Sequence, residues 1–598
     1  MTAPTTVATT PPTDRRTDVP AIEVRGLTFR YPGAAQDSLH DVDLTVEPGD
    51  FVAVVGGNGS GKTTLCKTFN GLIPHFWNGD ITGRVRVQGR STARRGVGEI
   101  AHDVGYVFQD FGNQLVRPTV RDDVSFGPLN FGHEDWADRT ERAIADLGLG
   151  DVAGTHTWQL SGGQQHLTAL AGAMALAPSV LVVDEPAAEV DPRRAAVVYD
   201  HLTRLNQEQG ITVVVIEHHA ELIARYARSV VLMADGRVRW HLPVREALAR
   251  RDDLADAHVP DPQVVALGRA LVPEVARGER PVPITVDECV NLLRPVVRPV
   301  PGAAARSGPP PSGTVASARE RRGPLVARMA GVEHGYRTVS GDRHTVLQGL
   351  DLDLHDGDRV ALVGSNGAGK STLLSVLSGL AVPRAGTVDV DGRDTRSVSA
   401  AALADTVCYL VQRPEEMFLQ DSVRADVAMH PQGRRLPDAD ALVEQVLDRV
   451  DLTRFADRDG RLLSGGQQRR ATLAIGLAMR PRLLLLDEPT SSLDLSSRDD
   501  VVGMLDALSD HIRCTVVATH DMHLVAEWAN RVVVLDHGRV IADTDPRTLF
   551  SSPDVLDQAR LVPPQVTQVG AALALPELPL TVDDLVRQAS ARPTEELA

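Results

Sequence analysis

Two glycine-rich stretches carry the residue types that could bind phosphate groups. The first, Gly56–Thr63, reads GGNGSGKT, and the second, Gly364–Ser371, reads GSNGAGKS. Each follows an apolar run and precedes a helix-like segment, residues 65–72 and 373–380. The glycines let backbone N–H groups curl around phosphates, and the helix adds its positive end. The lysine reaches the outer phosphates and the last hydroxyl ligates Mg²⁺, so strand, loop and helix together predict two phosphate-binding loops.

The distribution of lysine supports this interpretation. Three of the 62 basic residues are lysines, and two of them, Lys62 and Lys370, take the last-but-one position of the two loops. A compact ammonium fits among phosphate oxygens where a planar guanidinium does not. Chance placement of so rare a residue at both positions is the weaker explanation.

An acidic pair ends a continuous apolar run in two places. Asp184-Glu185 follows residues 180–183, and Asp487-Glu488 follows residues 483–486. Unbroken apolar runs are typical of parallel strands buried on both faces. The first acid of each pair suits Mg²⁺, and the second can orient or deprotonate an attacking water. A lone acidic pair is more often a solvated turn, but its place after a phosphate loop favours the functional interpretation.

The run Ser-Gly-Gly-Gln also occurs twice, at Ser161–Gln164 and Ser464–Gln467. At the start of a helix it presents a hydroxyl and bare N–H groups to an anion. The structural alternative is an ordinary helix start with serine as the N-cap. Two copies, each upstream of an acidic strand, make that alternative the weaker one.

The elements that must position these residues are repeated as well. Gln109 and Gln412, Ser161 and Ser464, and Asp184 and Asp487 are each 303 residues apart, and His218 and His520 are 302 apart. So long a period indicates a duplicated domain. Alternating strands around each strand–loop–helix unit predict an α/β core with an added antiparallel sheet, and residues 136–147 and 439–450 predict matching helices.

The repeat sets the expected domain boundaries. It extends past the core, since Pro262-Gln263-Val264 is echoed by Pro564-Gln565-Val566. A linker of about 30 residues spans roughly 30 Å as a flexible coil, which lets two domains face each other. The expected segments are a disordered tail (1–20), a first domain with a C-terminal appendix (21–294), a Pro/Gly-rich linker (295–324) and a second domain with an appendix (325–590).

Bulk composition limits the classes of function. The net charge of −17 argues against a general nucleic-acid binder. The four cysteines lack C-x-x-C spacing, which favours reduced thiols and a cytoplasmic setting. No stretch reaches the roughly 18 apolar residues of a membrane span, and the first 20 residues lack the apolar core of a secretory signal. Any membrane role is therefore expected to be peripheral.

Together these motifs resemble a tandem pair of ATP-binding-cassette (ABC) ATPase domains, each an α/β phosphate-loop NTPase with a helical subdomain. The resemblance implies ATP and Mg²⁺ as ligands and a role for each matching residue. The residues that would bind ATP are Tyr31, Gly56, Asn58, Gly59, Gly61, Lys62, Thr63, Thr64, Ser161 and Gly163 in the first copy and Tyr336, Gly364, Asn366, Gly367, Gly369, Lys370, Ser371, Thr372, Ser464 and Gly466 in the second. The residues that would bind Mg²⁺ are Thr63, Gln109 and Asp184, and Ser371, Gln412 and Asp487. The catalytic residues would be Glu185, Glu488, His218 and His520, with His219 an alternative to His218.

In this family two domains bind ATP between them, head to tail. Lys62 would then work with Ser464, and Lys370 with Ser161. Both sets of residues are complete, which predicts two competent sites. The first copy departs at residues 188–191 (AEVD against SSLD in the second) and has His166 where the second has Arg469, so equal turnover is not implied. Asp191 and Asp494 match the aspartate of the loop that links the two sites.

One branch of the family is the best match. Residues 107–109, 113–115, 118–120 and 123–128 resemble the region after the glutamine in ATPases of energy-coupling-factor (ECF) importers, and the appendices resemble their C-terminal segments. The resemblance implies a transmembrane coupling protein and a membrane substrate-binding protein as partners, at the cytoplasmic face of the membrane. The cargo would be a vitamin, a vitamin precursor or a transition-metal ion, selected by another subunit.

Two rival interpretations remain open. A soluble tandem ABC protein acting on ribosomes usually has a long, charged, helix-forming linker, unlike the Pro-rich segment here. A tandem sugar-importer ATPase usually has one degraded phosphate loop, whereas both loops here are intact.

Substitution of the proposed bases tests these assignments. Glu185→Gln and Glu488→Gln keep the side-chain shape but remove the proton acceptor. Each is expected to lower the rate of ATP hydrolysis, because a positioned general base contributes roughly 10²- to 10⁴-fold. Steady-state phosphate release measures the effect. If both variants hydrolyse ATP at the unchanged rate, the two glutamates are not the catalytic bases.

Overall fold

The computed structural model describes residues 19–187, 192–297, 323–337, 343–490, 501–504 and 512–590. Most of the predicted tail and most of the predicted linker lie outside the described residues. So do Asp191, Asp494 and residues 188–190, where the two copies differ in sequence. All four cysteines are described, and they are free and buried.

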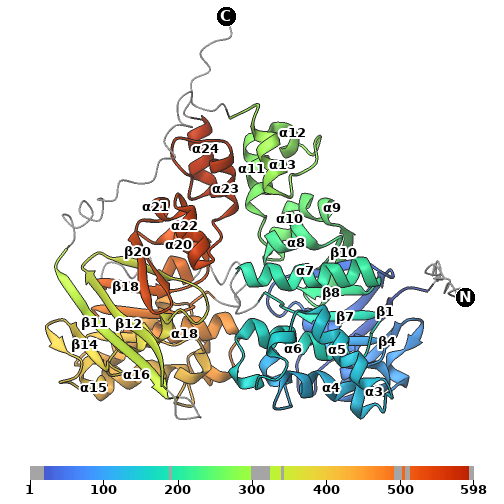
Figure 1. Ribbon diagram of the computed structural model, residues 1–598, viewed down its shortest axis with the longest axis horizontal. Helices are drawn as coiled ribbons and strands as arrows, with labels where there is room; N and C mark the ends of the chain where they lie inside the picture. Colours follow the sequence, from blue (N-terminus) through green and yellow to red (C-terminus); the bar gives the residue numbers. More distant parts are fainter. Residues whose placement is uncertain are drawn as a thin grey trace, which may run out of the picture.

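The two copies lie side by side and contain the same strands in the same order (Figure 1). The strands of the first copy are β1 (Ile22–Arg30), β2 (Leu39–Val46), β3 (Phe51–Val55), β4 (Asp80–Val87), β5 (Arg90–Ser91), β6 (Val104–Val107), β7 (Val180–Asp184), β8 (Thr212–Ile216), β9 (Ser229–Ala234) and β10 (Arg237–Pro243). Those of the second are β11 (Leu325–Arg337), β12 (Arg343–His355), β13 (Arg359–Val363), β14 (Ala385–Val390), β15 (Arg393–Asp394), β16 (Val407–Leu410), β17 (Leu483–Asp487), β18 (Cys514–Ala518), β19 (Arg531–Asp536) and β20 (Arg539–Thr544).

Most helices repeat as well, but the short helices Leu72–His75 and Pro273–Ala276 of the first copy have no counterpart among the described residues of the second. In the first copy they are α1 (Lys62–Phe69), α2 (Leu72–His75), α3 (Val97–Ile100), α4 (Val120–Asn130), α5 (Trp136–Asp146), α6 (Gly162–Met174), α7 (Pro192–Gln209), α8 (Ala220–Tyr226), α9 (Val244–Ala249), α10 (Arg251–Asp256), α11 (Gln263–Leu271), α12 (Pro273–Ala276) and α13 (Val286–Leu293). In the second they are α14 (Lys370–Leu377), α15 (Ala400–Leu403), α16 (Val423–Gly433), α17 (Ala439–Arg449), α18 (Gly465–Ala478), α20 (Met522–Trp528), α21 (Pro546–Phe550), α22 (Pro553–Ala559), α23 (Gln565–Ala572) and α24 (Val582–Ser590). No described helix is long and apolar enough to cross a bilayer.

Each copy has two sheets, as the alternating and continuous apolar patterns predicted. The antiparallel sheets run β2-β1-β4-β5 and β12-β11-β14-β15. The core sheets run β10-β9-β3-β8-β7-β6 and, in the second copy, β20-β19-β13-β18-β17-β16. Their strands are parallel except for the edge strands β10 and β20. The predicted α/β fold with an added antiparallel sheet is confirmed.

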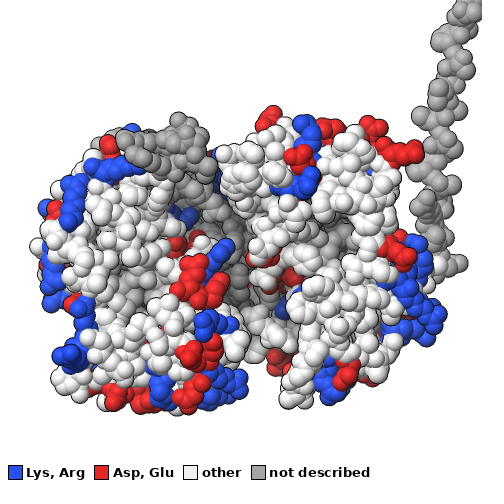
Figure 2. Space-filling model, turned by 90° about the horizontal axis from the view of Figure 1, so that it is seen from below, with Lys and Arg blue, Asp and Glu red and all other residues white. Residues whose placement is uncertain are grey.

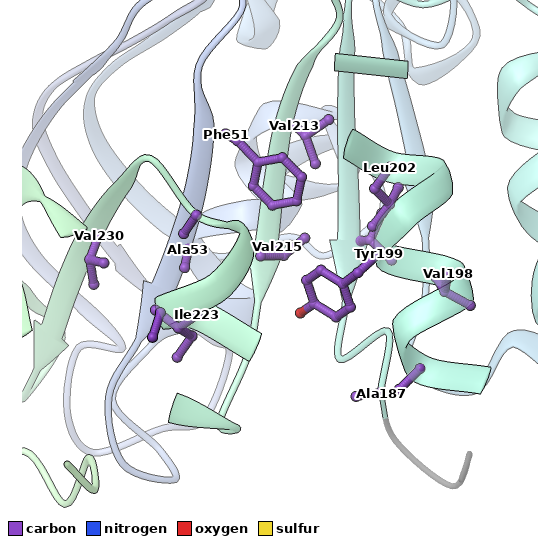
Figure 3. Packing of buried hydrophobic residues seen from close by; sticks show 14 of the residues in the cluster. Phe51, Ala53, Ala187, Val198, Tyr199, Leu202, Val213, Val215, Ile223 and Val230 are labelled. Atoms are coloured by element: carbon purple, nitrogen blue, oxygen red, sulfur yellow. The ribbon is translucent and has the colours of Figure 1, made fainter. Parts of the chain in front are cut away.

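Alternate residues of each central strand enter two different hydrophobic layers. Phe51 and Ala53 pack with helix α7, where Tyr199 and Leu202 are buried (Figure 3). Val52 and Val54 face the other way, toward α1 and the antiparallel sheet. Because both faces are covered, every residue of β3, β7 and β8 is buried, which explains their unbroken apolar sequences.

The helix after each phosphate loop begins earlier than the sequence pattern predicted. α1 starts at Lys62 and ends at Phe69, and α14 starts at Lys370 and ends at Leu377. Each helix is preceded by a glycine in the left-handed region, with φ of 98° at Gly61. The apolar pattern identified the buried face of each helix but not its first turn, whose polar residues border the loop.

The two appendices pack against each other and join the copies. Val264 and Val265 of α11 share one buried cluster with Val566 and Val569 of α23. The backbone N–H of Val566 donates to Gln263 Oε1 (2.9 Å), and that of Val264 donates to Gln565 Oε1 (3.2 Å). Gln263 and Gln565 are equivalent positions of the repeat, so these two bonds are related by an approximate two-fold axis. Figure 1 shows α11 beside α23 and α24.

A charge placed in this cluster is expected to separate the appendices. Val566 is 0% exposed, so Val566→Asp would bury a carboxylate without a partner, at a cost on the order of 3 kcal/mol. We expect a lower melting temperature and a larger radius of gyration in small-angle X-ray scattering. Val197→Asp is the control, because Val197 is 46% exposed on α7. Equal behaviour of the two variants would show that the appendices do not hold the copies together.

Candidate functional site

The residues singled out in the sequence meet at one edge of each core sheet. In the first copy the phosphate loop follows β3, Asp184 ends β7, and His218 follows β8. These three strands are adjacent and parallel, in the order β3-β8-β7. The carboxyl ends of adjacent parallel strands form the usual ligand-binding crevice of an α/β sheet.

Each phosphate loop is closed by its own lysine. Lys62 Nζ donates to the carbonyl oxygens of Gly56 (2.7 Å) and Gly57 (2.9 Å). Lys370 Nζ donates to the carbonyl oxygen of Gly364 at 2.8 Å. A Cβ at Gly56 would lie 2.1 Å from the carbonyl oxygen of Met233, and its φ is 143°. The loop therefore requires glycine there, and it forms a cradle whose size suits a phosphate chain.

The donor set for Mg²⁺ lies beside this cradle. Asp184 accepts hydrogen bonds from Thr63 and from Tyr106 Oη (3.3 Å). Burial, together with the charge of Glu185, raises the pKa of Asp184 to about 6. Among the described residues no cluster of three His, Cys, Asp or Glu could hold a metal by itself. One carboxylate, one hydroxyl and phosphate oxygens are the set that Mg²⁺ takes with a nucleotide, so the residues fit this ion.

The second copy repeats this arrangement. Asp487 accepts from Ser371 and from Tyr409 Oη at 3.1 Å. Burial raises the pKa of Asp487 as well.

The predicted bases are in contact with the predicted histidines. Glu185 Oε1 lies 3.0 Å from His218 Nε2, and Glu185 Oε2 accepts from Gln109 Nε2 at 2.7 Å. His219, the alternative candidate, does not take this position. It pairs with Glu217, and its Nδ1 lies 2.7 Å from Glu217 Oε1.

The corresponding contacts in the second copy use different atoms. His520 Nδ1, rather than Nε2, lies 2.9 Å from Glu488 Oε1. Although burial opposes both charges, this ion pair lowers the pKa of Glu488 and raises the pKa of His520. Between the described residues Gln412 and Glu488 there is no hydrogen bond of the kind that Gln109 makes.

The two Ser-Gly-Gly turns form capped helix starts. Ser161 Oγ accepts from the N–H of Gln164 (3.4 Å), and Gln164 Oε1 accepts from the N–H of Ser161 (3.0 Å). Ser464 and Gln467 form the same capping box in the second copy. Both serines are therefore N-caps. The N-terminus of each capped helix can also bind an anion.

The two candidate adenine-stacking tyrosines differ in their surroundings. Tyr31 Oη lies 3.3 Å from Thr64 Oγ1, and its ring packs edge-on against Phe29 at 4.8 Å. Tyr336 Oη lies 3.4 Å from Thr372 Oγ1. The Tyr336 ring packs edge-on against His334 at 5.2 Å and is 51% exposed, so the two rings have different aromatic neighbours.

One group near the site was not found from the sequence. Glu217 is 2% exposed and bonded to Tyr199 Oη (2.6 Å) and His219. The sequence does hold a signal for Glu217, because this glutamate directly follows the apolar run of β8. A carboxylate buried at the end of such a strand requires hydrogen-bonding partners. His166, which the sequence showed in place of Arg469, stacks on Phe111 at 4.7 Å, and burial lowers the pKa of His166 to about 4.

Comparisons with known proteins place these features in a family. A family model described as ABC transporter matches residues 39–188 and 347–491. A provisionally named ABC transporter ATP-binding protein of Methanosarcina mazei is 30% identical over 576 residues, covering 95% of this chain and 96% of the relative. One of Streptomyces avermitilis is 35% identical over 580 residues, covering 92% and 100%. Among solved structures, cbiO1 of Clostridium perfringens, titled part of the ABC transporter complex cbiONQ, is 27% identical with a TM-score of 0.36, covering 44% of this chain and 99% of that chain.

The fold and the repeated site define a tandem ATPase, with two phosphate-loop domains in one chain. Each domain has the parallel core, the antiparallel sheet and the helices of an ABC ATPase. The chain belongs to the ABC transporter ATP-binding proteins.

The Glu217–His219 pair predicts a pH dependence of stability. The Glu217 charge, opposed by burial, raises the pKa of His219 from 6.5 to about 9. Because the pKa of His219 is higher in the folded chain than in the unfolded chain, protonated His219 stabilises the fold. This stabilisation is complete below pH 6.5 and is lost as the pH rises through about 9. The side chain of His219 is 59% exposed, so solvent screens the pair and the effect is small.

Melting temperatures of the unchanged chain and His219→Gln measure this contribution. The difference between them is expected to be largest between about pH 5 and 6.5 and to shrink toward pH 9. A difference that stays constant or grows toward pH 9 would contradict the ion pair.

Proposed function

We propose that this chain is the ATP-hydrolysing subunit that energises a membrane importer of the ECF type. The proposal rests on one observation: a single chain has the same set of site residues in both copies, and its two appendices join the copies. In each copy a lysine-closed loop, a buried aspartate and a glutamate–histidine contact share one sheet edge. A sugar-importer ATPase with one degraded loop fits this arrangement less well.

Each side chain has a role in the proposed hydrolysis. Thr63, Gln109 and Asp184 would hold Mg²⁺ in the first site, and Ser371, Gln412 and Asp487 in the second. When bound, the ion neutralises phosphate charge. Glu185 and Glu488 take the proton of the attacking water at a carboxylate oxygen. His218 and His520 contact that carboxylate and hold the outer phosphate, while the loop lysines and glycines, with Tyr31 and Tyr336, orient ATP.

The two copies would complete each other's sites head to tail. Lys62 and Glu185 would work with Ser464 and Gly466, and Lys370 and Glu488 with Ser161 and Gly163. The capped starts of α6 and α18 support this, because each leaves N–H groups at the helix end for an anion. ATP binding would close the copies, and hydrolysis would reset them.

Exposed apolar side chains support a membrane partner. Val116, Phe126 and Leu129 are 60%, 44% and 45% exposed, and they lie within or just after the segment that resembles ECF ATPases. Such a surface suits the helices of a transmembrane coupling protein. The chain would then act at the cytoplasmic face of the membrane. A separate membrane protein would select the vitamin, vitamin precursor or transition-metal ion.

The alternative, a soluble tandem ABC ATPase acting on ribosomes, has less support. Binding to ribosomal RNA requires a basic footprint. The net charge is −17. On the face that Figure 2 shows, acidic and basic side chains are interspersed.

Affinity purification from detergent-solubilised membranes separates the two functions. A tagged chain is expected to recover a polytopic membrane protein in stoichiometric amount. The control is a chain with Phe126→Asp and Leu129→Asp, which is expected to lose this partner while keeping its ATP-binding residues. Recovery of ribosomes in place of a membrane protein would overturn the importer proposal.

A further inference from the structure

A fully bonded carboxylate lies directly before the histidine of the first site. Glu217 is 2% exposed and follows the last residue of β8. Its Oε1 accepts from the backbone N–H groups of His218 (2.8 Å) and His219 (2.9 Å) and lies 2.7 Å from His219 Nδ1. Its Oε2 accepts from Tyr199 Oη at 2.6 Å. Four donors therefore compensate the loss of water around this buried charge.

These bonds fix the backbone of His218 between two neighbouring strands. The N–H of Glu217 donates to the carbonyl oxygen of Val54 (3.3 Å) on β3, two residues before the phosphate loop. On the other side, the N–H of Glu185 donates to the carbonyl oxygen of Ile216 (3.0 Å). The second copy has equivalent backbone bonds, from Thr519 to Leu362 (3.1 Å) and from Glu488 to Ala518 (2.9 Å), so what is particular to Glu217 is its carboxylate, which accepts from the N–H of His218.

The second copy lacks this carboxylate. Thr519 stands at the equivalent position, and its Oγ1 accepts from the N–H of Asp521 at 3.0 Å. Asp521 caps α20 by accepting from the N–H groups of His523 and Leu524. In the first copy His219 takes the corresponding place and makes no side-chain cap on α8.

The histidines are held differently as a result. The N–H of His520 points to Glu488 Oε2 at 3.4 Å, and the ring presents Nδ1 to the same carboxylate. The N–H of His218 is bonded to Glu217 instead, and the ring presents Nε2 to Glu185.

We propose that Glu217 is a positioning residue for ATP hydrolysis at the first site. Its carboxylate holds the His218 backbone so that Nε2 faces Glu185, whereas the second site orients His520 through Glu488 itself. The inference rests on the proposed function, in which Glu185 and His218 act at the first site. It adds that turnover at the two sites depends on different residues.

The test uses the full chain with Glu488→Gln, which removes the base of the second site. In this background Glu217→Ala leaves two backbone N–H groups without an acceptor, and kcat is expected to fall roughly 10-fold or more while KM changes less than about threefold. Glu217→Gln keeps an amide oxygen for these N–H groups and is expected to retain most of the activity. If Glu488→Gln alone stops hydrolysis, the two sites are coupled. Glu217→Ala and Glu217→Gln are then compared in the chain that keeps Glu488, and kcat is again expected to fall more in Glu217→Ala than in Glu217→Gln.

A matched control separates positioning from stability. Asp103 is a buried carboxylate of the same copy, bonded to Arg90 (2.5 Å) and Arg95 (2.6 Å) away from the site. Asp103→Ala is expected to lower the melting temperature and leave kcat unchanged. If Glu217→Ala behaves like Asp103→Ala, with lower stability and unchanged kcat, the positioning role is wrong.

Two further variants keep the test decisive. If Glu217→Ala does not fold, Tyr199→Phe removes the hydroxyl bonded to Oε2 and is expected to lower kcat severalfold; unchanged kcat in Tyr199→Phe overturns the inference. If Glu185→Gln together with Glu488→Gln leaves hydrolysis intact, the proposed function fails instead, whatever Glu217 does.

Discussion

The parallel register of three neighbouring strands is the constraint on which both sites depend. Val54 of β3 is level with Ile216 of β8, and Ile216 is level with Asp184 of β7. The next residues along the chain are therefore Val55, Glu217 and Glu185, and the phosphate loop begins directly after Val55. In the second copy Leu362, Ala518 and Asp487 share one row in the same way. A slip of one residue would turn these side chains to the opposite face of the sheet.

This register explains why the central strands can be wholly apolar and still serve polar chemistry. Their side chains enter two hydrophobic layers, one under α7 and one under the antiparallel sheet. Polar side chains occur where the strands end, and there they form hydrogen bonds. Asp184 is bonded to Tyr106, and Glu217 to Tyr199. The burial that shapes the site also raises the pKa of Asp184.

Duplication has produced two sites with one architecture and different details. The phosphate loops, strand order and helix caps repeat. The groups around the histidines do not repeat, since Glu217 and His219 in the first copy correspond to Thr519 and Asp521 in the second. Near the first-site glutamine, a stacked Phe111–His166 pair takes the place of Arg469, whose guanidinium donates to the carbonyl oxygen of Val411 at 3.4 Å. The two copies therefore share the phosphate loop, the buried aspartate and its tyrosine, but not the contacts around the histidine.

The sequence by itself determined the repeat, the α/β class and the strand ends at which acids and histidines occur. These features are local: a phosphate loop needs its glycines and lysine in consecutive positions, and a buried strand needs a continuous apolar run. Only the tertiary structure decided that His218 rather than His219 faces Glu185, that the two histidines present different ring nitrogens, and that Glu217 is bonded to Tyr199 from a distant helix. These outcomes depend on hydrogen bonds between elements far apart in the chain, and the spacing of residues along one segment carries no record of them.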